Sequence, residues 1–275
     1  MSPTLKLEKV NLFYQDIGSG TPVVLLHGLT LSGSMWKPQI EDLSESFRLI
    51  IPDLRGHGKS VAPKHGYTIH HYASDIKDLI YRLNLRKVHL IGLSLGGAIA
   101  TEFSAAYSYL LHSTIVISPM PPRFIPGDDW EIKISKFRKV MAKDGVENAL
   151  ENVLLKESIF GKINVGLNEW IDLKKAIRQF SGYPLNEKVS MGNDSHRVME
   201  LLQAYDKPFM IITGENDTEI FHIAANALKT ALPKSQMVSI KDAGHLCSIE
   251  QPEKINSIML KFLNSVETKR NSNHE

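Results

Sequence analysis

A serine between two glycines is the residue of this chain best suited to act as a nucleophile. Ser94 is the centre of Gly92-Leu93-Ser94-Leu95-Gly96, which follows an apolar run and precedes small and apolar residues. The apolar run predicts a buried strand, and the residues after the serine predict a helix packed closely on a sheet. A sharp turn between strand and helix exposes the hydroxyl, and the flanking glycines relieve the crowding. The N–H groups that begin the helix can stabilise negative charge that develops beside this hydroxyl.

A histidine further along the chain fits the role of the base that a serine nucleophile needs. His245 lies just beyond the apolar run 237–240, and Asp217 lies just beyond the apolar run 209–212. Both side chains therefore follow predicted strands, as Ser94 does, and the carboxyl ends of parallel strands meet at one edge of a sheet. We predict that His245 is the general base and that Asp217 orients it.

Two other carboxylates compete with Asp217 for the acidic role. Glu215 lies on the same loop, and Asp242 lies three residues before His245. We interpret Asp242 as a solvated neighbour of Lys241. The preferred set then follows the chain order Ser, Asp, His, which is typical of one known catalytic triad.

Backbone donors are also needed for the oxyanion that forms when a serine attacks a carbonyl. The N–H of Leu95 comes directly after Ser94, and the N–H of Leu29 follows His27-Gly28 at the end of another apolar run. We predict that these two N–H groups form the oxyanion hole. His27 itself is interpreted as structural, because the donors are backbone groups.

Buried strands alternate with helical patterns along most of the chain. Apolar runs predict strands at 23–26, 49–51, 88–91, 114–117, 209–212 and 237–240. Apolar stripes of helical period lie between them, at Ile76, Leu79, Ile80 and Leu83, and at Ile220, Ile223, Ala224, Ala227 and Leu228. Continuous apolar runs are typical of a parallel sheet covered on both faces, so we predict an α/β fold with a mostly parallel central sheet. Such sheets bind ligands at the carboxyl ends of their strands.

The alternation of strands and helices stops between about residues 120 and 205. Several prolines follow the fourth apolar run, and helical patterns without strands come next, among them Ile134, Phe137 and Met141. We predict a core of residues 1–120 and 206–266, with a helical cap of residues 121–205 over the strand ends. The polar segment 267–275 is predicted to be a disordered tail.

The ordered set of motifs resembles that of the α/β-hydrolase superfamily over nearly the whole chain. The motifs are His27-Gly28, Trp36, Asp53-Leu54-Arg55-Gly56-His57-Gly58-Lys59-Ser60, Gly92 to Gly97, Gly214 to Asp217 and Gly244-His245. Within the superfamily the chain is similar to small capped esterases and lactonases, including 3-oxoadipate enol-lactonase and arylesterase-like enzymes. The resemblance implies the α/β-hydrolase fold, with Ser94 as nucleophile, His245 as base and Asp217 as acid. It implies structural roles for Asp53 and His57.

These observations favour a serine hydrolase that acts on a small carboxylic ester or lactone through an acyl-enzyme. The same triad can also serve carbon–carbon bond hydrolysis, peptide cleavage after an N-terminal proline, or cofactor-free perhydrolysis with acetate and peroxide. A different class stays open as well, because some relatives keep the triad but act as slow-turnover ligand receptors.

The composition is that of an ordinary globular protein, with 43% hydrophobic and 23% charged residues among 275 and a net charge of +2. So small a charge does not indicate nucleic acid or an anionic membrane as a partner. No apolar run reaches the ~18 residues of a membrane span, and the first residues lack the apolar stretch of a signal peptide. We expect a cytoplasmic enzyme with a small-molecule substrate, no cofactor and no metal. The sequence leaves the oligomeric state open.

Overall fold

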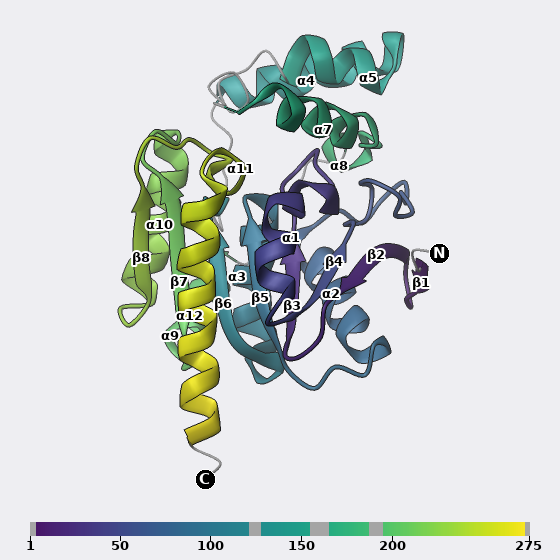
Figure 1. The fold of residues 1–275 in the computed structure, drawn as a ribbon. Coiled ribbons are helices and arrows are strands. Elements are labelled where there is room, and N and C mark those ends of the chain that lie inside the picture. The colour runs from purple at the N-terminus through teal and green to yellow at the C-terminus, as the bar shows by residue number, and fades with distance from the viewer. Residues whose placement is uncertain (1–3, 121–127, 155–164, 187–194, 273–275) are drawn as a thin grey trace.

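One mostly parallel sheet forms the centre of the molecule (Figure 1). The computed structural model describes residues 4–120, 128–154, 165–186 and 195–272. The strands of these residues are β1 (Thr4–Lys6), β2 (Asn11–Ile17), β3 (Pro22–Leu26), β4 (Arg48–Pro52), β5 (Val88–Leu93), β6 (Leu111–Ile117), β7 (Phe209–Gly214) and β8 (Gln236–Ile240). Their order in the sheet is β1-β2-β4-β3-β5-β6-β7-β8. The pairs from β4 to β8 are parallel, whereas β1 and β2 pair antiparallel at one edge.

All six predicted strands are present, as β3 to β8, and the α/β class is confirmed. β1 and β2 were not predicted from the sequence. β1 has three residues, none of them buried, and β2 has a short apolar run between polar residues, so neither stands out in the sequence as a buried strand. β2 buries Leu12, Phe13 and Tyr14 but ends in partly exposed and exposed residues.

Helices cover the sheet on both faces because alternate residues of each strand point to opposite sides. Val23 and Leu25 of β3 join one core cluster, which includes residues of α1 (Lys37–Ser44) and α12 (Pro252–Ser272). Val24 and Leu26 join the other, with residues of α2 (Ile69–Arg82), α3 (Leu95–Tyr107), α9 (Ser195–Gln203) and α10 (Glu219–Ala231). The sheet is thus the middle of three layers.

A group of helices lies beyond one end of this layered core (Figure 1). It consists of α4 (Asp128–Asp144), α5 (Val146–Ala149), the π-helical turn η3 (Leu150–Leu154), α7 (Leu167–Arg178) and α8 (Tyr183–Asn186). α7 packs against η1 (Gly33–Trp36), the short 3₁₀ helix that follows β3, so the group adjoins the carboxyl end of that strand. α9 belongs to the same stretch of sequence but packs on α3 and α10.

The division into a core and a cap of residues 121–205 stays a prediction. Parts of the predicted cap, residues 121–127, 155–164 and 187–194, lie outside the described residues. Among the described helices, none combines the length and the apolar character that a membrane crossing requires.

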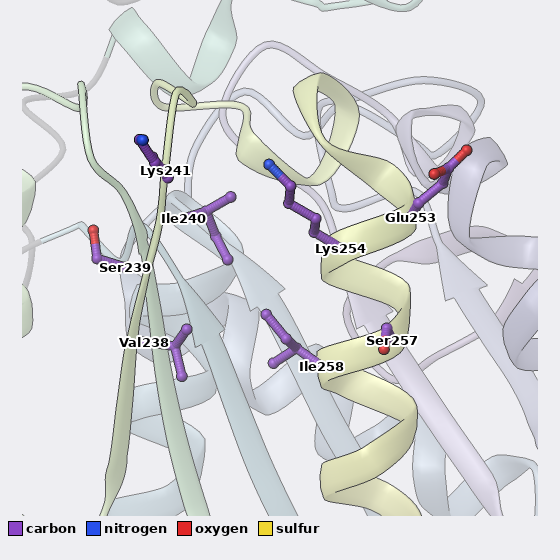
Figure 2. Close-up of a pocket in the computed structure, with 8 residues that line it drawn as sticks. All are labelled: Val238, Ser239, Ile240, Lys241, Glu253, Lys254, Ser257 and Ile258. Atoms are coloured by element: carbon purple, nitrogen blue, oxygen red, sulfur yellow. The ribbon is translucent and has the colours of Figure 1, made fainter.

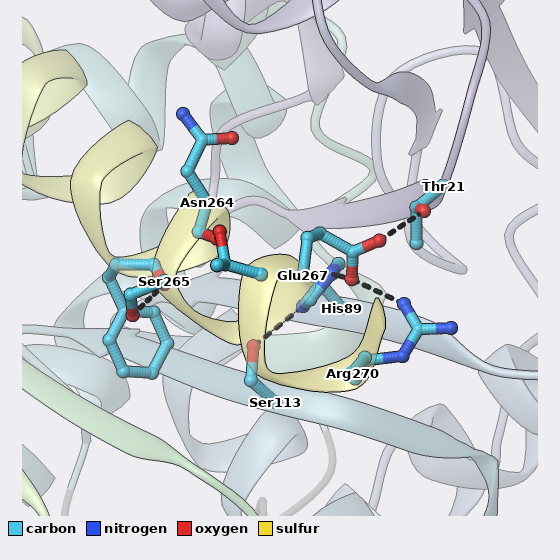
Figure 3. A network of polar contacts seen from close by, with 9 residues as sticks. Thr21, His89, Ser113, Asn264, Ser265, Glu267 and Arg270 are labelled. Carbon is cyan, nitrogen blue, oxygen red and sulfur yellow. Dashed lines mark hydrogen bonds and ion pairs between the residues drawn. The ribbon is translucent and has the colours of Figure 1, made fainter. Parts of the chain in front are cut away.

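The prediction of a disordered tail from residue 267 is wrong for the part that the structure describes, since α12 continues to Ser272. Glu267 explains why (Figure 3): its Oε1 lies 3.0 Å from Nε2 of His89, and its Oε2 accepts from the Thr21 hydroxyl at 2.7 Å. Arg270 contacts the same carboxylate. Glu267 thus joins the last turns of α12 to the buried His89, a contact that the polar composition of the segment does not reveal.

Candidate active site

The turn at Ser94 has a strained backbone. Its φ of 54° and ψ of −110° place a non-glycine residue outside the ordinary allowed regions. Three backbone hydrogen bonds hold it there: the Ser94 N–H donates to Ile117 at 2.9 Å, and its carbonyl accepts from Ala98 and Met120. The structure therefore places Ser94 between β5 and α3, as predicted, in a conformation that the surrounding backbone maintains.

Glycines around Ser94 allow the backbone segments to approach one another. A Cβ atom at Gly92 would lie 2.1 Å from the carbonyl oxygen of Gly96. A Cβ atom at Gly96 would lie 2.2 Å from the carbonyl oxygen of Leu26, which ends β3. Neither position can hold a side chain without moving backbone. The start of α3 is thereby kept close to the end of β3.

His245 and Asp217 form a hydrogen-bonded pair. Nδ1 of His245 lies 3.2 Å from both carboxylate oxygens of Asp217, and both side chains are buried. An ionised carboxylate only accepts, so Nδ1 carries the proton and Nε2 is free to accept another. The ring of Phe221 lies 4.0 Å from the imidazole, centroid to centroid, and restricts its rotation.

The loops that carry these two residues are joined through their backbones. The N–H of Asn216 donates to the Ala243 carbonyl at 2.8 Å. A Cβ atom at Gly214 would lie 2.1 Å from the Gly244 carbonyl oxygen, so only a glycine permits this approach. β7 and β8 are neighbours in the sheet, and their loops consequently bring Asp217 to His245.

The carboxylate of Glu215, one of the competing acids, has a partner other than His245. Oε2 of Glu215 accepts from the backbone N–H of Asp242 at 3.2 Å, and both residues are exposed. Within the described residues, the hydrogen bonds of the His245 side chain go to Asp217, and none joins it to Ser94. Hydrogen bonds between catalytic side chains are often long in the absence of substrate and shorten when substrate binds. The missing His245–Ser94 bond is therefore compatible with proton transfer from Ser94 to His245.

The predicted oxyanion donors lie near Ser94. Leu95 is the first residue of α3, where N–H groups have no partner within the helix. A Cβ atom at Gly28 would lie 3.6 Å from Cβ of Ser94, so the segment that leads to Leu29 passes directly beside the serine. The start of α3 and the backbone segment that follows β3 therefore both lie beside Ser94.

His27 has structural partners on both ring nitrogens. Its Nδ1 donates to the Gly28 carbonyl at 2.8 Å, and its Nε2 accepts from the Leu54 N–H at 2.9 Å. Burial lowers the pKa of His27, so the ring is neutral at pH 7. Asp53 accepts from the backbone N–H groups of Gly33 and Lys59 and likewise stabilises a turn.

Sequence reasoning missed two residues that touch the histidine loop. Phe221 packs on the imidazole, and Glu250 accepts hydrogen bonds from the backbone on both sides of His245. Phe221 could have been found as an aromatic side chain four residues after Asp217 at the start of a predicted helix.

A groove of about 580 Å³ lies elsewhere, between β8 and α12. Figure 2 shows Val238, Ile240 and Ile258 directed into it, with Lys241 and Lys254 near one end. None of the predicted site residues lines this groove. Among the described residues, no group of three or more His, Cys, Asp and Glu side chains is arranged to hold a metal ion.

The family model for the alpha/beta hydrolase fold matches residues 21–252. The chain is 31% identical over 265 residues to the AB hydrolase superfamily protein YisY of Bacillus subtilis (strain 168), covering 94% of this chain and 97% of that protein. It is 28% identical over 285 residues to the non-heme chloroperoxidase CPO-A1 of Kitasatospora aureofaciens, covering 93% and 96%. A thermophilic esterase from Thermogutta terrifontis, solved with malate bound, is 30% identical with a TM-score of 0.76, covering 94% of each chain.

The chain belongs to the alpha/beta hydrolase family. Membership and these relatives support a hydrolase activity.

Proposed function

We propose that this protein is a serine hydrolase that cleaves a small carboxylic ester or lactone. Ser94 is the nucleophile, His245 the general base and Asp217 the orienting acid. The observation that carries the proposal is the buried His245–Asp217 pair, whose tautomer leaves Nε2 able to accept a proton. The strained turn at Ser94 supports it, because strain that the surroundings maintain is common at functional sites.

The reaction has two halves. Nε2 of His245 takes the Ser94 proton while Oγ attacks the carbonyl carbon, and the N–H groups of Leu29 and Leu95 stabilise the oxyanion. The intermediate collapses to an acyl-serine, and the imidazolium gives its proton to the leaving alkoxide. Water, deprotonated by His245, then attacks the acyl carbon and releases the acid. Asp217 stabilises the imidazolium in both halves.

The test is hydrolysis of p-nitrophenyl esters of graded acyl length by the wild type and by Ser94→Ala. We expect rapid multiple turnover in the wild type and its loss in the variant, and the preferred acyl length then measures the acyl site. Turnover that persists in a folded Ser94→Ala protein would refute Ser94 as nucleophile. A wild type that a fluorophosphonate labels at Ser94, but that turns over slowly or once, would instead favour the carbon–carbon hydrolase or receptor alternatives.

Cofactor-free perhydrolysis is a second candidate, favoured by the similarity to a non-heme chloroperoxidase. In this reaction Ser94 and acetic acid form the acetyl-serine with release of water, and hydrogen peroxide then attacks it and releases peracetic acid. Incubation with acetate and peroxide tests it: peracetic acid that depends on Ser94 supports the activity, and its absence from an enzyme that hydrolyses esters rejects it.

A further inference from the structure

Glu250 hydrogen-bonds the backbone on both sides of His245. Its Oε2 accepts from the N–H of Gly244 at 3.0 Å, and its Oε1 accepts from the N–H of Leu246 at 3.1 Å. Glu250 ends α11 (Cys247–Glu250), the short helix that follows the loop. Its own N–H donates to the Leu246 carbonyl at 3.0 Å, so a backbone hydrogen bond also joins the end of α11 to the His245 loop.

The chemistry of this contact suits a carboxylate. Both partners are donors, and each oxygen of an ionised carboxylate is an acceptor without a proton. A glutamine of the same shape can accept from one N–H only, and its NH₂ group would face the other N–H. The two bonds therefore depend on the charge of Glu250 as well as on its length.

The position of the imidazole depends on the same loop. Asp217 and Phe221 contact the His245 ring and set its orientation. The distance between the ring and Ser94, in contrast, depends on the position of the loop backbone that carries His245. Proton transfer is sensitive to this place, since a displacement of about 1 Å can cost about 100-fold in rate.

We propose that Glu250 is a positioning residue, which fixes the His245 loop so that Nε2 reaches the Ser94 hydroxyl. The inference rests on the proposed serine hydrolase function and adds a residue to it. Glu250 acts through the backbone of Gly244 and Leu246 and needs no contact with substrate. Its effect should accordingly fall on the chemical step and leave substrate binding unchanged.

Steady-state kinetics of Glu250→Gln tests this role. We expect kcat for the best p-nitrophenyl ester to fall about 10- to 100-fold with KM within about twofold of the wild type. The rate at which a fluorophosphonate labels Ser94 should fall by a similar factor, because labelling also needs the base. The matched control is Glu253→Gln, which removes an exposed carboxylate three residues further on and should keep wild-type values.

A second variant covers the case in which Glu250→Gln does not fold. A Cβ atom at Gly244 would lie 3.3 Å from Oε1 of Glu250, so Gly244→Ala should displace the carboxylate slightly and lower kcat by a smaller factor. A kcat and a labelling rate equal to wild type in a folded Glu250→Gln protein would overturn the inference, as would a loss confined to KM or to Tm. Wild-type turnover that survives in Ser94→Ala would overturn the proposed function itself, so the two failures are distinguishable.

Discussion

Asp217 sets the orientation and the tautomer of the proposed base, His245. Its side chain is completely buried, and besides His245 it accepts from the N–H of Thr218 at 2.7 Å. The backbone bond holds the carboxylate while both of its oxygens face Nδ1 of the imidazole. A fixed acceptor at Nδ1 keeps the proton there and leaves Nε2 as the basic nitrogen.

Asp217→Asn should lower kcat by up to about 10⁴-fold, the loss seen in other serine triads when this acid becomes an amide. The amide NH₂ group can turn toward Nδ1 and favour the tautomer that carries its proton on Nε2, which cannot accept the Ser94 proton. Steady-state turnover of the best p-nitrophenyl ester measures the effect. Glu215→Gln, on the same loop, is the control and should remain close to wild type. Near-normal activity in Asp217→Asn would remove Asp217 from the site.

At the scale of elements, the contact between α3 and β3 depends on Gly96. Replacing it with alanine would place Cβ 2.2 Å from the Leu26 carbonyl oxygen, and that oxygen belongs to backbone that cannot turn aside. We expect Gly96→Ala to lower the free energy of unfolding by more than about 3 kcal/mol or to prevent folding. Urea unfolding followed by circular dichroism measures it. In the control Gly166→Ala, Cβ meets the flexible carboxylate of Glu169 and no backbone, so the loss should be limited to the poorer N-cap of α7, about 1 kcal/mol.

Sequence patterns predicted the strands that consist of continuous apolar runs. The strands β3 to β7 are buried and apolar, whereas β8 has apolar residues but buries only Ile240. The three proposed catalytic residues could be found because each follows one of the predicted strands. Apart from the His245–Asp217 pair, which the motifs indicated, the sequence did not predict the polar contacts made over long separations. Glu267 and His89 are 178 residues apart, and nothing local to either residue reveals their hydrogen bond. Glu250 was missed for a different reason: its partners are close in sequence but are backbone N–H groups, which no pattern of side chains reveals.

The last turns of α12 are held by Glu267. Burial opposes ionisation of this carboxyl, but hydrogen bonds from His89, Thr21 and Arg270 outweigh it and lower the pKa of Glu267 to about 2. Because the carboxylate accepts from Nε2 of His89, Nδ1 of that ring is the acceptor for the Ser113 hydroxyl at 2.7 Å. The network fixes one tautomer of a fully buried histidine.

Glu267→Ala should lower the free energy of unfolding by about 1–3 kcal/mol, because it leaves the buried Nε2–H of His89 without its acceptor. The end of α12 should also exchange its amide hydrogens faster. Urea unfolding and hydrogen exchange measure the two effects. Thr268→Ala serves as control, since its exposed hydroxyl bonds only within the helix. Unchanged stability and exchange in Glu267→Ala would mean that apolar packing alone orders this segment.

At the scale of the whole molecule, neutral histidines are distributed through the core. His27, His57 and His89 are fully buried, and His112 is half-buried. Burial is the main cause that lowers the pKa of each, to about 4 for His112. In the unfolded chain their pKa values return to about 6.5.

Acid should therefore destabilise the protein well before its carboxylates titrate. Well above pH 6.5 these histidines are neutral in both states, so through them pH has no effect on stability. As pH falls below 6.5, the unfolded chain binds protons that the folded chain does not, and the free energy of unfolding decreases. The slope is at most about 1.4 kcal/mol per pH unit for each histidine that stays neutral in the folded state.

Urea unfolding at pH 7.5, 6.5 and 5.0 measures this decrease in the free energy of unfolding. The variant His112→Asn should show a shallower decrease, because it lacks one of these histidines. A free energy of unfolding that is constant from pH 7.5 to 5.0 would mean that the core admits the charged imidazoles after all.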